Sequence, residues 1–322
     1  MSMNEQLHRF GTDARLCGIL HMPGTAGATR NRIATVFITA GLLHKPGPFR
    51  LYVELSRSLS VTGVPSLRFD LSGIGESGPR PGGDNAEHAA VADVQEAMDW
   101  LEAEHGIRNF VLAGLCSGAE VAHRTAIGDP RVVGMIAMDG YIMRTPAYYF
   151  WHYVPRVFSF HKWTDFLASK VQRLFRRASG HDEPEVDALS FWDGPGPDRK
   201  QLADEFRALC RRKVHQLQIF SGGSGDCSYA RQFQDAFDDV DFGDCLTVEF
   251  LPETDHVYIL HADRVRLMKL ITDWITEHFV VPAAARPQRA GRRAGFETET
   301  TLIPGITNAS RSITLAGRRN AE

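Results

Sequence analysis

Residues 110–119 read FVLAGLCSGA, an apolar run that ends in Gly-Leu-Cys-Ser-Gly and continues into a helical pattern. A nucleophile presented on a sharp turn from a buried strand into a helix needs small residues two positions before and two positions after it, because strand and helix approach closely there. With Cys116 at the centre of the turn, these two positions are Gly114 and Gly118. The spacing therefore predicts that Cys116 is the nucleophile of a strand–turn–helix site.

The adjacent Ser117 does not fit the same frame. If Ser117 were central, Leu115 would occupy a position that must be small, and its side chain would clash. We therefore expect Ser117 to contribute its backbone N–H, which would face the oxyanion that forms during acyl chemistry. The alternative role for Cys116 is that of a buried core residue, since cysteine is among the most buried residue types.

The composition is that of an ordinary globular protein. The 322 residues are 43% hydrophobic and 23% charged, with a net charge of −3, so no global basic field favours nucleic acid as a partner. The five cysteines match neither a zinc site nor a disulfide framework, and no metal or cofactor is expected. No apolar signal region begins the chain and no run approaches a membrane span. We expect a cytoplasmic protein.

Short apolar runs alternate with helical patterns along most of the chain. This alternation is typical of an α/β fold with a mostly parallel central sheet and helices on both faces. Strands are expected at 15–23, 32–41, 64–70, 109–115, 132–140, 213–223 and 245–252, and helices at 48–63, 86–105, 117–127, 229–237 and 264–279.

The alternation stops after the strand at 132–140. Residues 141–200 contain aromatic and basic helical segments without a strand pattern, so we expect a helical cap inserted between two parts of one core, residues 1–140 and 201–280. Such a cap would lie over the carboxyl edge of the sheet, where ligands bind in open α/β folds. Residues 281–322 are rich in Ala, Arg, Gly and Thr, and we expect a disordered tail.

A carboxylate and a histidine follow two later strands. Asp226 comes after the strand at 213–223, and His256 comes after the strand at 245–252. The order nucleophile, acid, base matches one of the known chain orders of a catalytic triad, so we predict a triad of Cys116, Asp226 and His256. Asp139, at the end of the strand that follows the turn, is the alternative acid.

The loop after the strand at 32–41 is the expected source of a second oxyanion donor. Gly41 would let the backbone approach the substrate closely, and the N–H of Leu42 is the candidate donor. His44 in the same loop is a candidate pocket residue. A dinucleotide site at the glycine-rich loop 69–78 is excluded, because Pro79 and Pro81 interrupt any helix that would follow.

These features together resemble the α/β-hydrolase superfamily over roughly residues 8–280. The loop RFDLSGIGESG at 68–78 is similar to one in its serine aminopeptidase-like branch, which includes monoacylglycerol lipase-like proteins. The cysteine-centred turn resembles dienelactone hydrolases and polyhydroxyalkanoate synthases, which use a Cys-Asp-His triad. The resemblance implies that Cys116 is the nucleophile, His256 the base and Asp226 the residue that orients it.

A cysteine nucleophile predicts a thioester acyl-enzyme. Water would complete the hydrolysis of an ester or thioester, whether the acyl group is free or bound to a carrier. An amine, alcohol or thiol acceptor would instead make the chain an acyltransferase, and a pseudo-hydrolase that only binds a ligand or partner is the non-catalytic alternative.

The aromatic part of the expected cap has three interpretations. Its side chains could pack on each other and on the sheet edge, form an apolar acyl pocket above Cys116, or form a helix on a membrane surface. Pro155 interrupts the helix and weakens the last interpretation. The candidate pocket residues are Tyr148, Trp151, Phe158 and Trp163.

Overall fold

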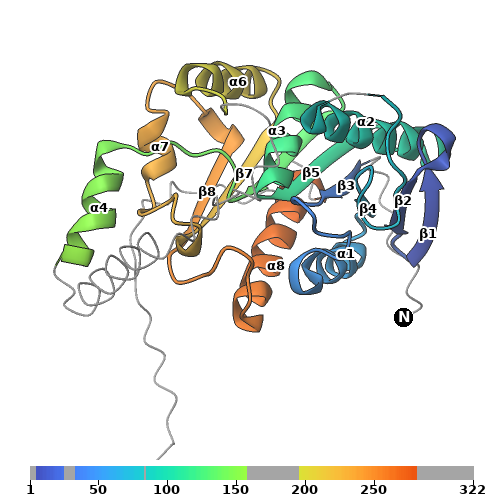
Figure 1. Cartoon of the computed structure of the whole chain (residues 1–322), viewed down its shortest axis with the longest axis horizontal. Helices are drawn as coiled ribbons and strands as arrows, with labels where there is room; N and C mark the ends of the chain where they lie inside the picture. The colour runs from blue at the N-terminus through green and yellow to red at the C-terminus, as the bar shows by residue number, and fades with distance from the viewer. Residues whose placement is uncertain (1–4, 25–32, 83–84, 158–195, 281–322) are drawn as a thin grey trace, which may run out of the picture. The chain divides into compact units, whose positions relative to one another are not determined.

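A computed structural model describes residues 5–24, 33–82, 85–157 and 196–280. The described part contains an eight-stranded sheet in the order β1-β2-β4-β3-β5-β6-β7-β8 (Figure 1). All neighbouring strands from β4 to β8 are parallel, whereas β2 is antiparallel to both β1 and β4. The strands are β1 (Glu5–Phe10), β2 (Leu16–His21), β3 (Ile33–Ile38), β4 (Ser66–Asp70), β5 (Asn109–Leu115), β6 (Val132–Met138), β7 (His215–Ser221) and β8 (Leu246–Leu251).

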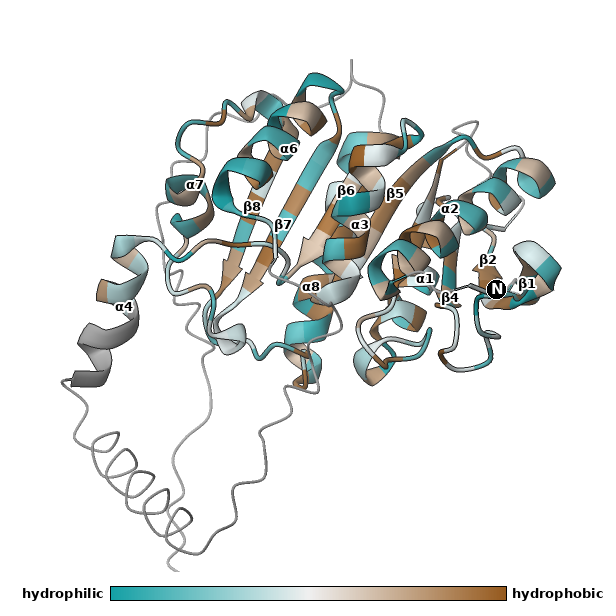
Figure 2. Ribbon diagram, turned by 45° about the horizontal axis from the view of Figure 1, so that its top comes forward, coloured by the Kyte–Doolittle hydropathy of each residue, from teal (hydrophilic) through white to brown (hydrophobic). Residues whose placement is uncertain are grey.

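Helices cover both faces of the sheet (Figures 1 and 2). One core cluster packs α1 (Leu51–Val61) and α8 (His261–Ile275) on one face, and the other packs α2 (Ala86–His105), α3 (Ser117–Gly128), α6 (Arg199–Arg211) and α7 (Gln232–Ala236) on the opposite face. The side chains of strand β5 point alternately to the two faces of the sheet. Those of Phe110 and Leu112 belong to one cluster, and those of Val111 and Ala113 belong to the other. Burial on both faces explains why this strand is apolar throughout.

The predicted α/β class and sheet are confirmed, and two elements begin and end at the predicted residues. Helix α2 spans Ala86–His105 and strand β5 spans Asn109–Leu115, as expected. Helix α2 begins where the Asn85 side chain accepts a hydrogen bond from the His88 N–H, and it ends at Gly106, which has a φ of 65°. These are the capping residues that a helix start and stop require.

The segment expected as a cap is described only in part. Helix α4 (Pro146–Val157) belongs to it, whereas 158–195 and the expected tail at 281–322 lie outside the described residues. The cap boundaries therefore stay a prediction. Helix α6 was not predicted, and it contacts α3 and buries Leu202, Phe206 and Leu209 in the core.

Candidate active site

The turn between β5 and α3 has the geometry that the glycine spacing predicts. Cys116 lies at the turn with φ 53° and ψ −123°, a region that residues with a side chain rarely occupy. A Cβ at Gly114 would lie 2.2 Å from the carbonyl carbon of Gly118, and a Cβ at Gly118 would lie 2.6 Å from the Ile38 oxygen. No larger side chain fits at either position, and the strain presents the exposed Cys116 at the carboxyl edge of the sheet.

The side chain of Ser117 faces a different group from the thiol. Its Oγ accepts a hydrogen bond of 2.9 Å from the Gly41 N–H in the loop after β3. As the first residue of α3, Ser117 has a backbone N–H that a helix leaves without an intrahelical acceptor. This N–H is therefore free of a helical acceptor and suited to donate a hydrogen bond to an oxyanion next to Cys116.

The carboxylate that contacts His256 is Asp139, which was the alternative acid. Asp139 Oδ2 lies 2.9 Å from His256 Nδ1, and the Asp139 side chain is only 3% exposed. The backbone N–H and the hydroxyl of Ser221 also donate to the carboxylate, at 2.7 and 2.6 Å. These donors hold Asp139 in one orientation at the end of β6.

The structure gives Asp226, the acid predicted from the sequence, a partner other than His256. Its carboxylate pairs with Arg144 at 2.9 Å, and its side chain is 54% exposed. Gly223 packs directly against the His256 loop, since a Cβ at Gly223 would lie 2.6 Å from the Asp255 Cα. Asp226 follows the expected strand after η4 (Gly222–Ser224) and lines the same cleft as His256, while its carboxylate pairs with Arg144.

The electrostatics of His256 favour its protonated form. Its hydrogen bond to Asp139, and then a hydrogen bond to Cys116, raise the pKa of His256 to about 10, although burial opposes the shift. Because Nδ1 contacts Asp139, Nε2 is the ring nitrogen that remains to interact with the thiol. An imidazolium between a carboxylate and a thiol is the arrangement that stabilises a reactive thiolate.

The loop after β3 contains the second candidate oxyanion donor. Gly41 has a φ of 50°, and a Cβ added there would meet no atom within 4 Å, so its backbone conformation rather than crowding explains the glycine. The N–H of Leu43 donates to the Ala40 carbonyl at 2.9 Å, which places Gly41 and Leu42 at the centre of a tight turn. The side chain of Leu42 is 76% exposed, so its role at this position depends on the backbone.

A cleft of about 440 Å³ lies beside Cys116, Asp139 and His256 and is also lined by Glu120, Tyr141 and Phe220. Of the candidate pocket residues that the structure describes, namely His44, Tyr148 and Trp151, none lines it. Tyr148 is buried and donates its hydroxyl to the Gly225 carbonyl, Trp151 is 54% exposed, and His44 lies against Gly75. Phe158 and Trp163 lie outside the described residues.

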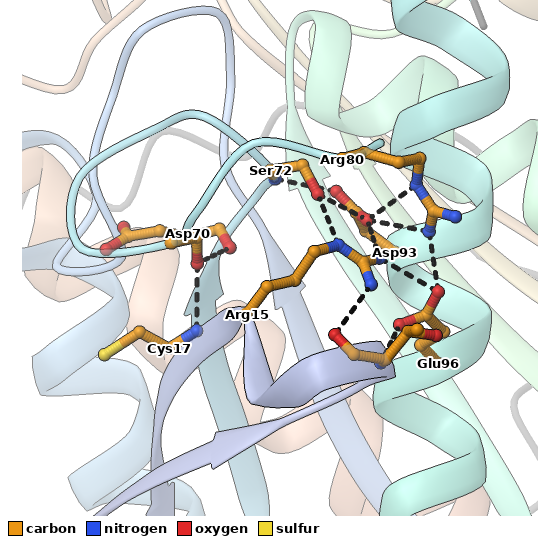
Figure 3. A network of polar contacts seen from close by, with 9 residues as sticks. Arg15, Cys17, Asp70, Ser72, Arg80, Asp93 and Glu96 are labelled. Carbon is orange, nitrogen blue, oxygen red and sulfur yellow. Dashed lines mark hydrogen bonds and ion pairs between the residues drawn. The ribbon is translucent and has the colours of Figure 1, made fainter. Parts of the chain in front are cut away.

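An ionic network holds the loop after β4, and the sequence patterns did not predict it (Figure 3). Arg15 and Arg80 both contact the carboxylates of Asp93 and Glu96, at 2.8 to 2.9 Å. Asp93 also accepts from the N–H and hydroxyl of Ser72. Since Arg15 is 78 residues from Asp93 in the sequence, only the folded chain brings these groups together, and the network fixes the loop that follows Asp70.

A family model for serine aminopeptidase S33 matches residues 31–206. The chain belongs to this family. The family is named for a serine, whereas in this member the turn between β5 and α3 has Cys116 at its centre. No match was found among curated protein sequences.

Solved structures with the same fold include hydrolases from fungi, archaea and cyanobacteria. The α/β-hydrolase GrgF from Penicillium sp. sh18 is 14% identical with a TM-score of 0.55, covering 87% of this chain and all of that one. An esterase from Pyrococcus furiosus is 14% identical with a TM-score of 0.56, covering 86% and 92%. A dienelactone hydrolase from Anabaena variabilis is 12% identical with a TM-score of 0.53, covering 86% and 98%. These similarities establish the α/β-hydrolase fold.

The described residues contain neither a membrane-spanning helix nor a cluster of metal ligands. Within 5–24, 33–82, 85–157 and 196–280, no helix is long and apolar enough to cross a membrane. In the same ranges, no group of three or more His, Cys, Asp or Glu side chains could hold a metal ion.

Proposed function

We propose that this chain hydrolyses acyl esters or thioesters, with Cys116 as nucleophile, His256 as acid and base, and Asp139 as the residue that orients His256. The observation that carries the proposal is the hydrogen bond between Asp139 and His256, on a cleft that Cys116 also lines and where Cys116 contributes to the raised pKa of His256. Three supports converge on it: the strained turn at Cys116, the hydrolase family and the cleft beside the thiol.

The first half of the reaction forms an acyl-enzyme. The Cys116 thiolate attacks the acyl carbon, and the carbonyl electrons move onto oxygen, where the N–H groups of Ser117 and Leu42 donate hydrogen bonds. The C–O or C–S bond to the leaving group then breaks. The His256 imidazolium gives its proton to the departing alcohol or thiol, and a thioester remains on Cys116.

The second half consumes the thioester. Neutral His256 removes a proton from water as the oxygen attacks the thioester carbon. The C–S bond then breaks, which releases the carboxylic acid and restores the thiolate–imidazolium pair.

Acyl transfer is the second candidate function, and the cysteine itself favours it. A thioester passes its acyl group to amines, alcohols and thiols, and Cys116 is exposed to solvent from which such an acceptor could enter. Addition of an amine or alcohol at fixed ester concentration distinguishes the two: an acylated acceptor as the main product supports transfer, and free acid supports hydrolysis.

The test uses p-nitrophenyl butyrate and a butyryl thioester as substrates. We expect release of p-nitrophenol by the wild type, and its loss in the Cys116→Ala variant. Unchanged turnover in Cys116→Ala refutes the proposal. Loss of turnover in Ser117→Ala together with full turnover in Cys116→Ala would make Ser117 the nucleophile.

A further inference from the structure

The loop that carries the Leu42 N–H is fixed at two points by side chains from other elements. At its start, the Gly41 N–H donates to Ser117 Oγ at 2.9 Å. At its end, the Lys45 N–H donates to Asp70 Oδ1 at 2.6 Å. Leu42 lies between these two anchors, so its backbone has little freedom to move relative to the thiol.

The second anchor is a buried ion pair. Lys45 Nζ lies 2.8 Å from Asp70 Oδ2, and Asp70 is fully buried at the end of β4. Glu76 in the following loop also pairs with Lys45, and the Ser77 hydroxyl donates to the Asp70 carbonyl at 2.6 Å. Breaking a buried pair leaves an uncompensated charge, so this anchor is costly to remove.

The first anchor joins the two halves of the oxyanion site. Ser117 accepts from the loop with its side chain, while its own N–H lies at the start of α3 next to Cys116. One residue therefore sets the separation between the two N–H groups that would hold the oxyanion. Hydrogen-bond donors act in catalysis only when they are fixed where the charge develops.

We propose that Ser117 is a positioning residue, whose hydroxyl holds the loop at Gly41 so that the Leu42 N–H faces the oxyanion. The Lys45–Asp70 pair is the opposite anchor of the same loop. This role explains why a serine follows the cysteine at the turn. The inference rests on the proposed function for its catalytic consequence, but the anchoring itself can be measured without turnover.

The test compares Ser117→Ala with Ser117→Thr, which keeps the hydroxyl, and with the control Ser60→Ala. Ser60 lies on α1, and its hydroxyl donates to the Arg57 carbonyl of the same helix. The first readout is amide hydrogen exchange in the peptide that covers residues 39–45. We expect faster exchange in Ser117→Ala alone, because the loop loses one anchor. Unchanged exchange in that variant refutes the anchoring whether or not the chain is an enzyme.

The second readout separates thiol reactivity from oxyanion stabilisation. Alkylation of Cys116 by iodoacetamide forms no oxyanion, whereas acylation by p-nitrophenyl butyrate does. For Ser117→Ala we expect kcat to fall by about tenfold or more with little change in KM, an unchanged alkylation rate, and recovery in Ser117→Thr. Equal losses of alkylation and acylation would mean that Ser117 acts on the thiol, which refutes positioning of the loop. Full turnover in Cys116→Ala refutes the proposed function but leaves the exchange result standing.

Discussion

His256 Nδ1 and Asp139 Oδ2 lie 2.9 Å apart although 117 residues separate them in the chain. The contact joins the loop after β8 to the end of β6, and Ser221 at the end of β7 fixes the carboxylate between them. Since the three strands are neighbours in the parallel sheet, their carboxyl ends meet at one edge. The relationship makes Asp139 the partner that sets the ring orientation and the charge of His256.

Replacing Asp139 should therefore impair catalysis far more than replacing Asp226. We expect Asp139→Asn to lower kcat for p-nitrophenyl butyrate by about a hundredfold or more, because the ring loses both its orientation and the charge that stabilises the imidazolium. Asp226→Asn is the matched control and should change kcat by less than about threefold, since its carboxylate pairs with Arg144. If Asp226→Asn lowered kcat more than Asp139→Asn did, Asp226 would be the acid, as the sequence predicts.

The protonation of His256 can be followed directly by NMR of ¹⁵N-histidine-labelled protein. The ring should stay an imidazolium at pH 8 and titrate near its raised pKa of about 10. In Asp139→Asn the titration should move down toward the usual pKa, because the first cause of the shift is removed. A neutral ring in the wild type at pH 8 would contradict the ion-pair description.

The raised pKa of His256 should make the free energy of unfolding fall as the pH rises. Because the folded state binds this proton more tightly than the unfolded chain, the stabilisation from His256 is complete below its usual pKa of 6.5. It should be lost as the pH rises toward about 10. Urea unfolding across this range should show the loss in the wild type and a smaller one in His256→Gln.

The network around Asp93 should be important for stability. Asp93→Ala leaves Arg15 and Arg80 without one of their carboxylates, and Arg15 is nearly buried. We expect the free energy of unfolding to fall by about 3 kcal/mol. The control Asp273→Ala breaks only an exposed pair with Lys269 and should cost less than about 1 kcal/mol. Equal losses in the two variants would show that the network is no stronger than a surface pair.

The close approach at the turn makes Gly118 intolerant of a side chain. In Gly118→Ala the new Cβ would meet the Ile38 carbonyl oxygen at 2.6 Å, and backbone cannot move aside cheaply. We expect a loss of about 1 to 3 kcal/mol in the free energy of unfolding together with loss of activity. Gly128→Ala at the other end of α3 meets no atom within 4 Å and should be neutral. A wild-type-like Gly118→Ala would contradict the frame centred on Cys116.

The sequence was most informative where one local pattern determines the geometry. Gly114 and Gly118 predicted the frame of the turn, because the steric requirement applies to positions fixed relative to Cys116. The acid was harder to predict, since Asp139 and Asp226 both follow strands of the same sheet. The choice between them depends on the path of the chain through η4 and on the donors from Ser221, which no spacing encodes.

Polar contacts between residues far apart in the sequence could not be predicted for a similar reason. Lys45 and Asp70 are 25 residues apart, and Arg15 and Asp93 are 78 apart, so neither pair produces a local signal. Helix α6 was missed because its polar face dominates the segment. Only Leu202, Ala203, Phe206 and Leu209 are buried in it.

The most direct test of the account is the identity of the acylated residue. The enzyme should be quenched with acid during turnover of p-nitrophenyl butyrate and analysed by intact mass and peptide mapping. We predict one butyryl group, carried by Cys116 and absent from Cys116→Ala. An adduct on Ser117, or turnover by Cys116→Ala at the wild-type rate, would contradict it.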